Sequence, residues 1–562
     1  MKKVVNLRLV LLIFVCISLV FSFSCNKDSS NDSNGADQIA DYNCNLYWSN
    51  YEGINKLQTK SEVTAYSGEI SNDSVENGVI FSPYYTLTVN GQNVPVYATR
   101  SANGIHSFVY LDVEIIDKTK PFTIKTEFTV TEHSTVLQQN GKKEPSVLVL
   151  PQKHGVVATI TKDKISAEIK SIGSFSFVFN KKHDQPVTVF VTQKEDQSEI
   201  FKNREIVYVE PGNYSTLDSY QTTLFTEGNR VYYFKAGRYQ TDMISLPENS
   251  VLYLERNAYV QVMPSPTGVK TNAILSSANN VTVAGRGLLD FSACTAYNAS
   301  KAYNKAGISF NGAEQIVFSG LTVINSQTWT LCFVDCKDLH VYNNLMIAYR
   351  IIADGIMLSD CKDAVVEYNF VRTGDDAFET KSTSANGLTE RVLFQYNDAW
   401  TDKAIAYGCV YESNHDTRGV TFKNNSVGFA LGNWSGHLGC CVVQMGNRRG
   451  AVIENITFED IEIYASDNQA ILNLYIGGNA GQGEGWGTIN NITFKNITVE
   501  RNSGGVLNVR TYSSDGCSIG DVYLEGVYSN GEAFTKLNYL KEGRFINSAS
   551  NFDPNTNLHF LD

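Results

Sequence analysis

Three aspartates in one short stretch of the sequence have the residue types and the spacing of an acid–base pair. Asp354 precedes a glycine, and Asp375 and Asp376 follow it twenty-one and twenty-two positions later. If the chain returns to the same place after such an interval, the three carboxylates are crowded together. Crowded like charges raise the pKa of the most disfavoured carboxyl, so one group keeps its proton while another is ionised. General acid and general base catalysis require such a separation.

A sequence repeat in the second half of the chain indicates that the chain does return to the same place at such intervals. Eight segments share a polar turn, a short β run with apolar first and third positions, a polar or glycine break, and a second β run. Their first apolar residues are Val281, Ile316, Leu339, Ala364, Val392, Val420, Ile456 and Ile492. The shortest intervals, from Ile316 to Leu339 and from Leu339 to Ala364, are too short for the blades of a β-propeller, and no segment has the 3.6-residue pattern of a helical solenoid. The sequence therefore predicts an all-β chain with a parallel β-helix.

Stacking of successive coils would bring the aspartates together. Parallel strands lie about 4.8 Å apart, so residues one coil apart occupy equivalent positions. Asp354 and Asp376 are expected to stack, and alignment of "WTLCFVDCKDL" with "DGIMLSDCKDA" puts Trp329 one coil below Asp354. Asp375 and Asp376 can face the same side only if the chain bends at Gly374. The alternative is that Asp-Gly and Gly-Asp-Asp are only turn sequences at the corners of a solenoid.

The first third of the mature chain has a different pattern. Alternating strands with hairpin-type turns predict an antiparallel β-sandwich-like domain over residues 41–205. The predicted β-helix follows over residues 206–545 and ends in a C-terminal tail over residues 546–562.

The N-terminus has the features of an export signal. Lys2, Lys3 and Arg8 precede an apolar run that ends at Cys25, and about 15 apolar residues are short for a membrane span. The "SFSC" ending resembles a bacterial lipobox, which predicts a signal peptide over residues 1–24, lipidation of Cys25 and a polar tether over residues 25–40. We therefore expect export and a lipid anchor at the outer membrane, the cell surface or the periplasm of a bacterium. A simple cleaved signal is the alternative.

Charge and cysteine usage limit the classes of partner. The net charge of −12 argues against nucleic acid, which needs a basic surface. Nine cysteines remain after Cys16 and Cys25, without CxxC or Cys/His spacing suited to zinc. We predict no metal and no cofactor, membrane contact only through the lipid anchor, and mostly small buried cysteines. The sequence leaves disulfides and the oligomeric state open.

Asp-Gly followed one coil later by Gly-Asp-Asp resembles the active-site pattern of the inverting β-helix glycoside hydrolases. These include polygalacturonase family 28 and dextranase/isopullulanase family 49. Family 49 also has a β-sandwich ahead of its β-helix, so the likeness spans roughly residues 40–540. The resemblance implies a right-handed parallel β-helix, with Asp375 as the general acid and with Asp354 and Asp376 positioning the attacking water.

The sequence departs from the family 28 pattern at three places. Ile352 and Ala353 precede Asp354, whereas the family 28 pattern has a sequence that resembles Asn-Thr at these two positions. No Gly-His-Gly follows one coil after the aspartate pair, and no Arg-x-Lys follows to hold a uronate carboxylate. These departures favour a neutral polysaccharide or oligosaccharide substrate, such as the α-glucans dextran or pullulan. A polygalacturonase-like or exo-α-galactosidase-like hydrolase is the alternative.

Several side chains near the predicted cluster could hold a sugar. Aromatic rings stack on sugar C–H faces, while charged side chains can hydrogen-bond to hydroxyl groups. The candidate substrate-binding residues are Trp329, Trp400, Asp402, Lys403, Tyr407, Glu379 and Lys381.

Two other functions fit the same architecture. A polysaccharide lyase would use a Lys or Arg base, with the clustered aspartates as calcium ligands. A non-catalytic glycan-binding solenoid would bind sugar through its aromatic side chains and would not depend on Asp375. The sequence leaves open which glycan and linkage are cleaved, and whether the attack is endo or exo.

Overall fold

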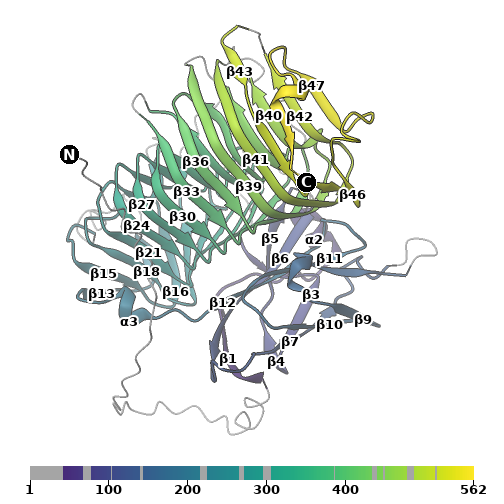
Figure 1. Cartoon of the computed structure of the whole chain (residues 1–562). Helices are drawn as coiled ribbons and strands as arrows, with labels where there is room; N and C mark the ends of the chain where they lie inside the picture. Colours follow the sequence, from purple (N-terminus) through teal and green to yellow (C-terminus); the bar gives the residue numbers. More distant parts are fainter. Residues whose placement is uncertain are drawn as a thin grey trace. The chain divides into compact units, whose positions relative to one another are not determined.

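The computed structural model describes residues 42–67, 78–102, 104–138, 144–214, 225–264, 271–294, 305–384, 387–432, 439–446, 450–477, 486–512 and 515–561. The predicted signal peptide, the tether and Cys25 lie outside these residues. Tyr42–Asp562 form one compact unit, in which a β-sandwich precedes a long solenoid (Figure 1).

The N-terminal domain is a sandwich of two sheets. One sheet has the strand order β2-β5-β6-β12-β11-β8, with β1 paired to β6, and the other has the order β4-β3-β7-β10-β9. All neighbours are antiparallel except β6 and β12. The strands are β1 (Cys44–Trp48), β2 (Ile80–Phe81), β3 (Tyr85–Val89), β4 (Gln92–Val94), β5 (Tyr97–Ser101), β6 (Gly104–Ile115), β7 (Ile124–Val130), β8 (Val147–Leu150), β9 (Ala158–Thr161), β10 (Lys164–Ile169), β11 (Gly173–Phe179) and β12 (Val187–Gln193).

The rest of the chain is a parallel β-helix with three ladders of stacked strands. The first ladder consists of β13 (Glu205–Val209), β15 (Arg230–Phe234), β18 (Val251–Leu254), β21 (Val281–Gly285), β24 (Glu314–Ser319), β27 (Lys337–Tyr342), β30 (Lys362–Glu367), β33 (Thr389–Gln395), β36 (Thr417–Lys423), β43 (Cys517–Ile519), β44 (Val522–Glu525) and β48 (Leu558–Phe560). The second consists of β14 (Gly212–Tyr214), β16 (Gly237–Thr241), β19 (Ala258–Val262), β22 (Leu288–Asp290), β25 (Thr322–Ile324), β28 (Leu345–Ala348), β31 (Phe370–Thr373), β34 (Asp398–Thr401), β37 (Ser426–Ala430), β45 (Tyr528–Ser529) and β46 (Glu532–Ala533). The long strands β39 (Ala451–Ser466) and β41 (Gly487–Asn502) run through both.

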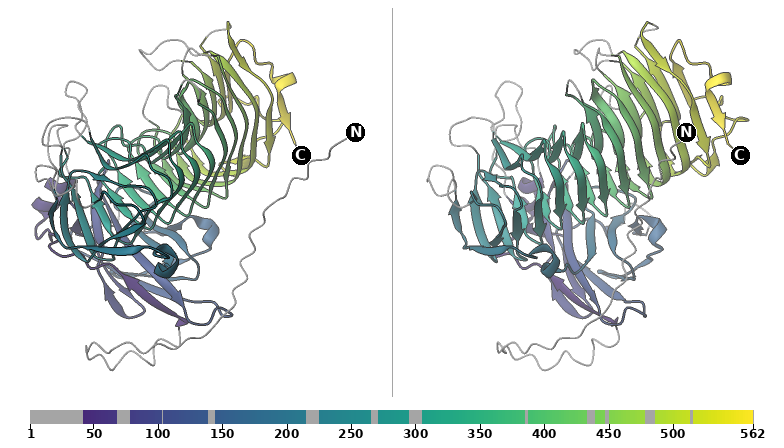
Figure 2. Two further views of the ribbon diagram at one scale, coloured as in Figure 1. Left: turned by 90° about the vertical axis from the view of Figure 1, so that its left-hand side faces the viewer. Right: turned by 60° about the vertical axis from the view of Figure 1, so that its left-hand side comes forward.

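The third ladder is a separate sheet. It consists of β17 (Ile244–Ser245), β20 (Thr271–Ser276), β23 (Lys305–Asn311), β26 (Leu331–Val334), β29 (Ile356–Ser359), β32 (Phe378–Ser382), β35 (Tyr407–Ser413), β38 (Cys441–Met445), β40 (Ala470–Ile476), β42 (Gly505–Thr511) and β47 (Phe545–Ser548). The described residues also include the short helices α2 (Lys60–Ser67), η1 (Gln152–His154), α3 (Gln197–Ile200) and α5 (Pro554–Asn557). The views in Figure 2 show the coils following one another in sequence order. The predicted all-β chain, a β-helix preceded by a β-sandwich, is confirmed.

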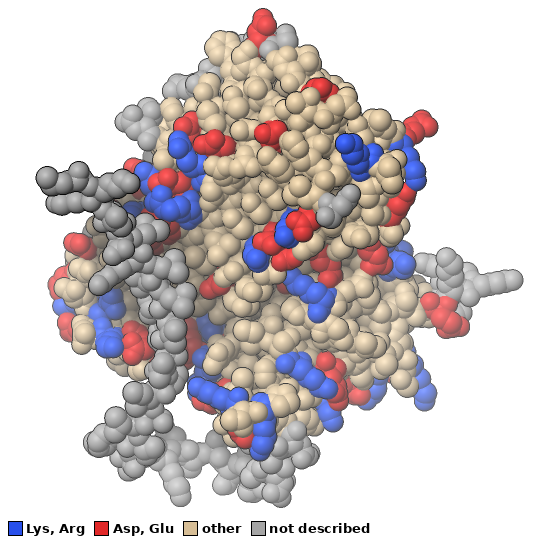
Figure 3. Space-filling model, viewed as in Figure 1, with Lys and Arg blue, Asp and Glu red and all other residues tan. Residues whose placement is uncertain are grey.

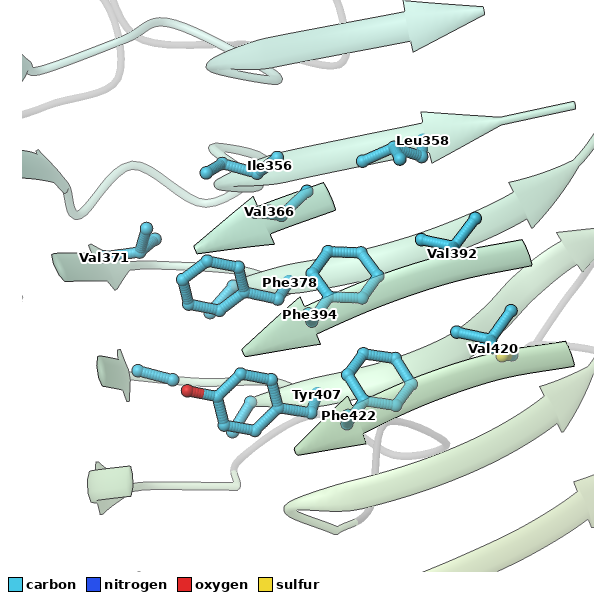
Figure 4. Packing of buried hydrophobic residues seen from close by; sticks show 14 of the residues in the cluster. Ile356, Leu358, Val366, Val371, Phe378, Val392, Phe394, Tyr407, Val420 and Phe422 are labelled. Carbon is cyan, nitrogen blue, oxygen red and sulfur yellow. The ribbon is translucent and has the colours of Figure 1, made fainter. Parts of the chain in front are cut away.

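Aromatic side chains fill the interior of the solenoid in columns. Phe394 stacks on Phe422 at 4.8 Å between ring centroids, and Phe378 stacks on Tyr407 at 5.2 Å (Figure 4). Such pairs arise because the apolar first and third positions of each β run repeat at the same place in every coil. The core therefore fixes the register of the coils.

Buried asparagines form a second column at the corner between the first and second ladders. The backbone amide of Asn344 donates to Oδ1 of Asn369 at 3.0 Å, that of Asn369 to Oδ1 of Asn397 at 3.0 Å, and that of Asn397 to Oδ1 of Asn425 at 2.9 Å. Each side-chain amide also donates to the Oδ1 of the next asparagine. The corner thus satisfies its buried polar groups by repeating one hydrogen bond from coil to coil.

The seven-stranded sheet of the sandwich covers the outer face of the second ladder. One buried cluster joins the two domains, and it includes Tyr97, Phe108, Tyr110 and Phe190 from the sandwich with Ile347, Phe370, Trp400 and Phe429 from the solenoid. This face of the β-helix is therefore a domain interface.

The C-terminal residues differ from the prediction. Residues 546–562, predicted as a tail, include most of β47, which pairs with β42, and β48, which pairs with β44. Leu558 is buried in the solenoid core, so apolar packing continues almost to the chain end. The prediction of a tail is wrong.

Two surface features bear on partners. Figure 3 shows acidic and basic side chains intermixed over the face viewed, with no large area of one sign among the described residues there. No helix within the described ranges is both long and apolar enough to span a membrane.

Candidate active site

The three aspartates lie in two consecutive turns between the second and third ladders. Asp354 lies between β28 and β29, and Asp375 and Asp376 lie between β31 and β32. β29 and β32 pair in parallel, and the Gly355 amide donates to the carbonyl oxygen of Asp376 at 2.8 Å. Asp354 and Asp376 therefore stack one coil apart, as predicted from their spacing.

Two glycines allow these turns to approach each other closely. A Cβ atom on Gly355 would lie 2.3 Å from the carbonyl oxygen of Ala377, and one on Gly374 would lie 2.2 Å from that of Tyr349. Both distances are far inside van der Waals contact, so neither position can hold a side chain. The bend at Gly374, on which the prediction depended, is the point where the two coils touch.

Hydrogen bonds hold the second turn in place. The carbonyl oxygen of Asp375 accepts from Oγ1 of Thr373 at 2.7 Å and from Oγ1 of Thr401 at 3.2 Å. The Asp376 carboxylate accepts from the backbone amide of Ile405 at 3.0 Å. Asp376 thus has a donor that favours its ionised form.

Burial and mutual repulsion separate the protonation states. Asp354 and Asp376 are 3% exposed and Asp375 is 7% exposed. Burial raises the pKa of Asp354 to about 6, with a further rise from Asp376, while Lys381 acts in the opposite direction. Burial, and then the charges of Asp354 and Asp376, raise the pKa of Asp375 well above its ordinary value. Asp375 therefore has the character of a proton donor beside an ionisable acceptor.

Lys381 forms an ion pair with Asp354. Its Nζ lies 3.3 Å from Asp354 Oδ2, 3.2 Å from Glu379 Oε1 and 3.1 Å from Glu412 Oε2. It also lies 5.2 Å from the centroid of the Trp329 ring. Burial alone would lower the pKa of Lys381, but these carboxylates together raise it well above its usual value. Lys381 therefore stays charged and stabilises the ionised form of Asp354.

Glu379 is a fully buried neighbour of this pair. Burial raises its pKa well above the ordinary value, the charge of Lys381 acts in the opposite direction, and the charges of Asp354 and Asp376 add to the rise.

The structure brings only part of the predicted binding set to the aspartates. Trp329, Glu379 and Lys381 adjoin them through the contacts above. Lys403 is half-buried in the turn between β34 and β35, and its role stays a prediction. The other three candidates face elsewhere.

Tyr407 lies inside the solenoid. Its side chain is fully buried in the core, and its hydroxyl donates to the carbonyl oxygens of Asn397 and Ser426 at 2.9 Å each. Phe378, which pairs with Tyr407 in the third ladder, points inward as well. The prediction that Tyr407 contacts substrate is wrong because its position in the β run faces the dry interior.

Trp400 and Asp402 belong to the domain interface. Trp400 is 2% exposed and packs against His106 of the sandwich at 5.6 Å between ring centroids. Both carboxylate oxygens of Asp402 pair with the guanidinium of buried Arg372, at 2.9 and 3.2 Å. Arg372 also contacts His106 Nδ1 at 3.1 Å. The prediction that Trp400 and Asp402 bind substrate is wrong, since the sandwich covers these side chains.

Glu412 was not predicted from the sequence, although it contacts Lys381. It lies in β35, where the pairing with β32 shifts register after Thr380. Because of that irregularity, Glu412 does not lie at a constant interval from the aspartates, so its position could not be found by counting along the chain. No group of three or more His, Cys, Asp or Glu side chains within the described residues has an arrangement that could hold a metal ion. The nine described cysteines are buried and form no disulfide with one another.

Known proteins share this sequence pattern and fold. The family model described as "Glycosyl hydrolases family 28" matches residues 263–527. Probable exopolygalacturonase B of Aspergillus flavus is 26% identical over 197 residues, which are 34% of this chain and 35% of that protein. Exopolygalacturonase B of Aspergillus niger is 25% identical over 197 residues, again 34% of this chain and 35% of that protein. The match thus spans about a third of the length of these relatives.

Two solved structures resemble the fold. Dex49A from Penicillium minioluteum gives a TM-score of 0.65 at 12% identity, covering 92% of this chain and 100% of that chain. The polygalacturonase from Erwinia carotovora ssp. carotovora gives 0.50 at 15% identity, covering 64% of this chain and 98% of that chain. At these identities the likeness shows the fold alone. The chain thus resembles glycoside hydrolase family 28 in sequence over residues 263–527, and it shares the parallel β-helix fold of these two structures.

Proposed function

We propose that this chain hydrolyses glycosidic bonds of a polysaccharide or oligosaccharide with inversion at the anomeric carbon. The observation that carries the proposal is the stacking of three buried aspartates in two consecutive turns of the solenoid. Asp375 has a strongly raised pKa and no ion pair among the described residues, whereas Asp354 has Lys381 at 3.3 Å. One carboxyl can therefore donate a proton while its neighbour accepts one.

Each aspartate has one role in the reaction. Asp375 donates its proton to the glycosidic oxygen as the bond from that oxygen to the anomeric carbon breaks. A water molecule attacks this carbon from the opposite face, and the Asp354–Asp376 pair accepts its proton. An ionised pair separated from the acid by a water molecule is the arrangement used by inverting glycosidases. The leaving sugar takes the donated proton, and the product carries the water oxygen with inverted configuration.

The relatives support galacturonan as the first candidate substrate. Curated proteins that match this chain are named exopolygalacturonases. A neutral α-glucan such as dextran or pullulan is the second candidate, because two buried cations near the aspartates are already paired with carboxylates. Lys381 contacts three carboxylates, and Arg372 is paired with Asp402. Export and lipid anchoring through Cys25 also stay proposals.

The stereochemistry of the product tests the proposed function. We expect incubation with polygalacturonate, dextran and pullulan to release sugar whose first-formed anomer, followed by NMR, is inverted relative to the substrate linkage. A retained anomer would contradict the mechanism. Calcium-dependent formation of an unsaturated product would identify a lyase instead, and binding without turnover would identify a glycan-binding solenoid.

Lys381→Gln is expected to shift the acid limb of the pH profile of kcat/KM toward higher pH. Asp354 must be ionised to accept a proton, so activity falls as the pH drops below its pKa of about 6. Loss of the positive charge raises this pKa, and the acid limb of kcat/KM should shift by about one pH unit toward higher pH. Lys381→Arg keeps the charge and should leave the limb near its original position. A Lys381→Gln profile that is lower in height but unshifted would rule out this role.

A further inference from the structure

One hairpin of the sandwich crosses the turns that carry the catalytic aspartates. Oγ1 of Thr99 donates to Oδ1 of Asn325 at 3.2 Å. The guanidinium carbon of Arg100 lies 5.4 Å from the ring centroid of Tyr349. The amide of Ala102 donates to Oδ2 of Asp402 at 3.4 Å. Successive residues at the end of β5 therefore contact successive coils of the solenoid.

The register of the second ladder locates the catalytic turn among these contacts. Ala348 pairs with Thr373, and Thr373 with Thr401, so the next residues along, Tyr349, Gly374 and Asp402, share one column. Arg100 contacts the coil below Gly374, and Ala102 contacts the coil above it. Ser101 lies between these two residues and therefore adjoins the Gly374–Asp375 turn.

The hairpin carries polar groups without a matching partner. Arg100 is 6% exposed, and its Nη1 has no hydrogen-bond partner among the described residues. Ser101 is 2% exposed, and its Oγ also has no partner there. A guanidinium stays charged in proteins, and burial of a charge without a counter-charge is costly. The Tyr349 ring face compensates only part of that cost.

We propose that Arg100 and Ser101 of the sandwich form a substrate-binding site beside Asp375, in which the guanidinium binds the carboxylate of an acidic sugar. This inference rests on the proposed glycosidase function and selects the acidic class of substrate. A carboxylate supplies the two parallel acceptors that a guanidinium matches. The nearby cations Lys381 and Arg372 are already paired with carboxylates, whereas Nη1 of Arg100 has no hydrogen-bond partner within the described residues. Ser101 is suited to hydrogen-bond a hydroxyl of the same sugar unit.

Binding to an inactive variant tests this site without turnover. In the Asp375→Asn background, calorimetry with trigalacturonic acid is compared with calorimetry with the same trisaccharide after reduction of its carboxyl groups to alcohols. We expect Arg100→Gln to weaken binding of the acid about tenfold to hundredfold, the range for hydrogen bonds to charged groups. Binding of the reduced sugar should change less than threefold. Lys164→Gln removes an exposed positive charge from the same domain and should change neither affinity.

Thermal unfolding separates this role from a structural one. Arg100→Gln removes a buried charge that lacks a counter-charge, so the Tm should stay the same or rise. A lower Tm with equal weakening for both trisaccharides would assign Arg100 to the domain interface and overturn the proposal. An unchanged affinity for trigalacturonic acid in Arg100→Gln, or no binding of it to the parent, would overturn it as well. Inverting hydrolysis of a neutral glucan alone would leave the proposed function intact and reject only this inference.

Discussion

Asp375→Asn is expected to lower kcat on a polysaccharide by about 10²–10⁴-fold, the usual contribution of a general acid. The raised pKa of Asp375 arises from burial and from the charges of Asp354 and Asp376. An amide has nearly the same shape but cannot donate that proton, so the glycosidic oxygen would leave as an alkoxide. KM should change little because the side-chain volume is preserved. Initial rates of reducing-sugar release measure the effect.

A substrate with a better leaving group distinguishes the acid from the base. An aryl glycoside with a low-pKa phenol needs little protonation, so Asp375→Asn should recover much of its activity on it. Asp354→Asn should stay inactive on both substrates because activation of water is still required. Asp363→Asn, which removes a carboxylate of β30 that pairs with Arg391 of β33, serves as the matched control and should keep full activity. Equal losses for Asp375→Asn on both substrates would contradict its assignment as the acid.

Arg372→Met is expected to destabilise the protein by about 3–5 kcal/mol, the range for breaking a buried ion pair from one side. Arg372 is fully buried and Asp402 is 5% exposed, so the variant leaves a carboxylate without its cation. His106 and the carbonyl oxygen of His183 in the sandwich also lose a contact. Urea unfolding followed by tryptophan fluorescence measures the change.

A second substitution tests the origin of this loss. Arg372→Met combined with Asp402→Leu removes both charges and should recover most of the stability, because replacement of a whole buried pair is often neutral. Arg391→Gln removes an arginine from an exposed pair and should cost less than about 1 kcal/mol. If the double variant is no more stable than Arg372→Met alone, packing rather than charge dominates at this interface.

The number of residues between successive coils predicted most of what the sequence could indicate about the site, namely which side chains stack. Side chains that recur at the same slot of successive coils must stack, so the positions of Asp354, Asp376 and Trp329 followed from counting along the chain. The aromatic core followed from the same rule, since the first and third positions of each run point inward. Counting works where no residue is inserted between the slots being compared.

Counting could not tell which side of the solenoid wall a side chain faces. The turn from β34 to β35 is one residue longer than the turn from β31 to β32, so alternation from Asp376 does not carry over to Tyr407. Trp400 does face outward, but the sandwich, which is formed by a distant N-terminal part of the chain, covers it. Contacts between domains leave no periodic signal in the sequence. For the same reason the sequence did not indicate that Arg100 lies near the aspartates.

The asparagine column links the coils that carry the proposed catalytic groups, at a different corner of each coil. Asn344 begins the second-ladder run that leads to Asp354, and Asn369 begins the run that leads to Asp376. Their hydrogen bonds hold one coil at a fixed rise above the next, and the same rise separates Asp354 from Asp376. A change in the gap between the proposed donor and acceptor would therefore require a change in the spacing of a whole coil.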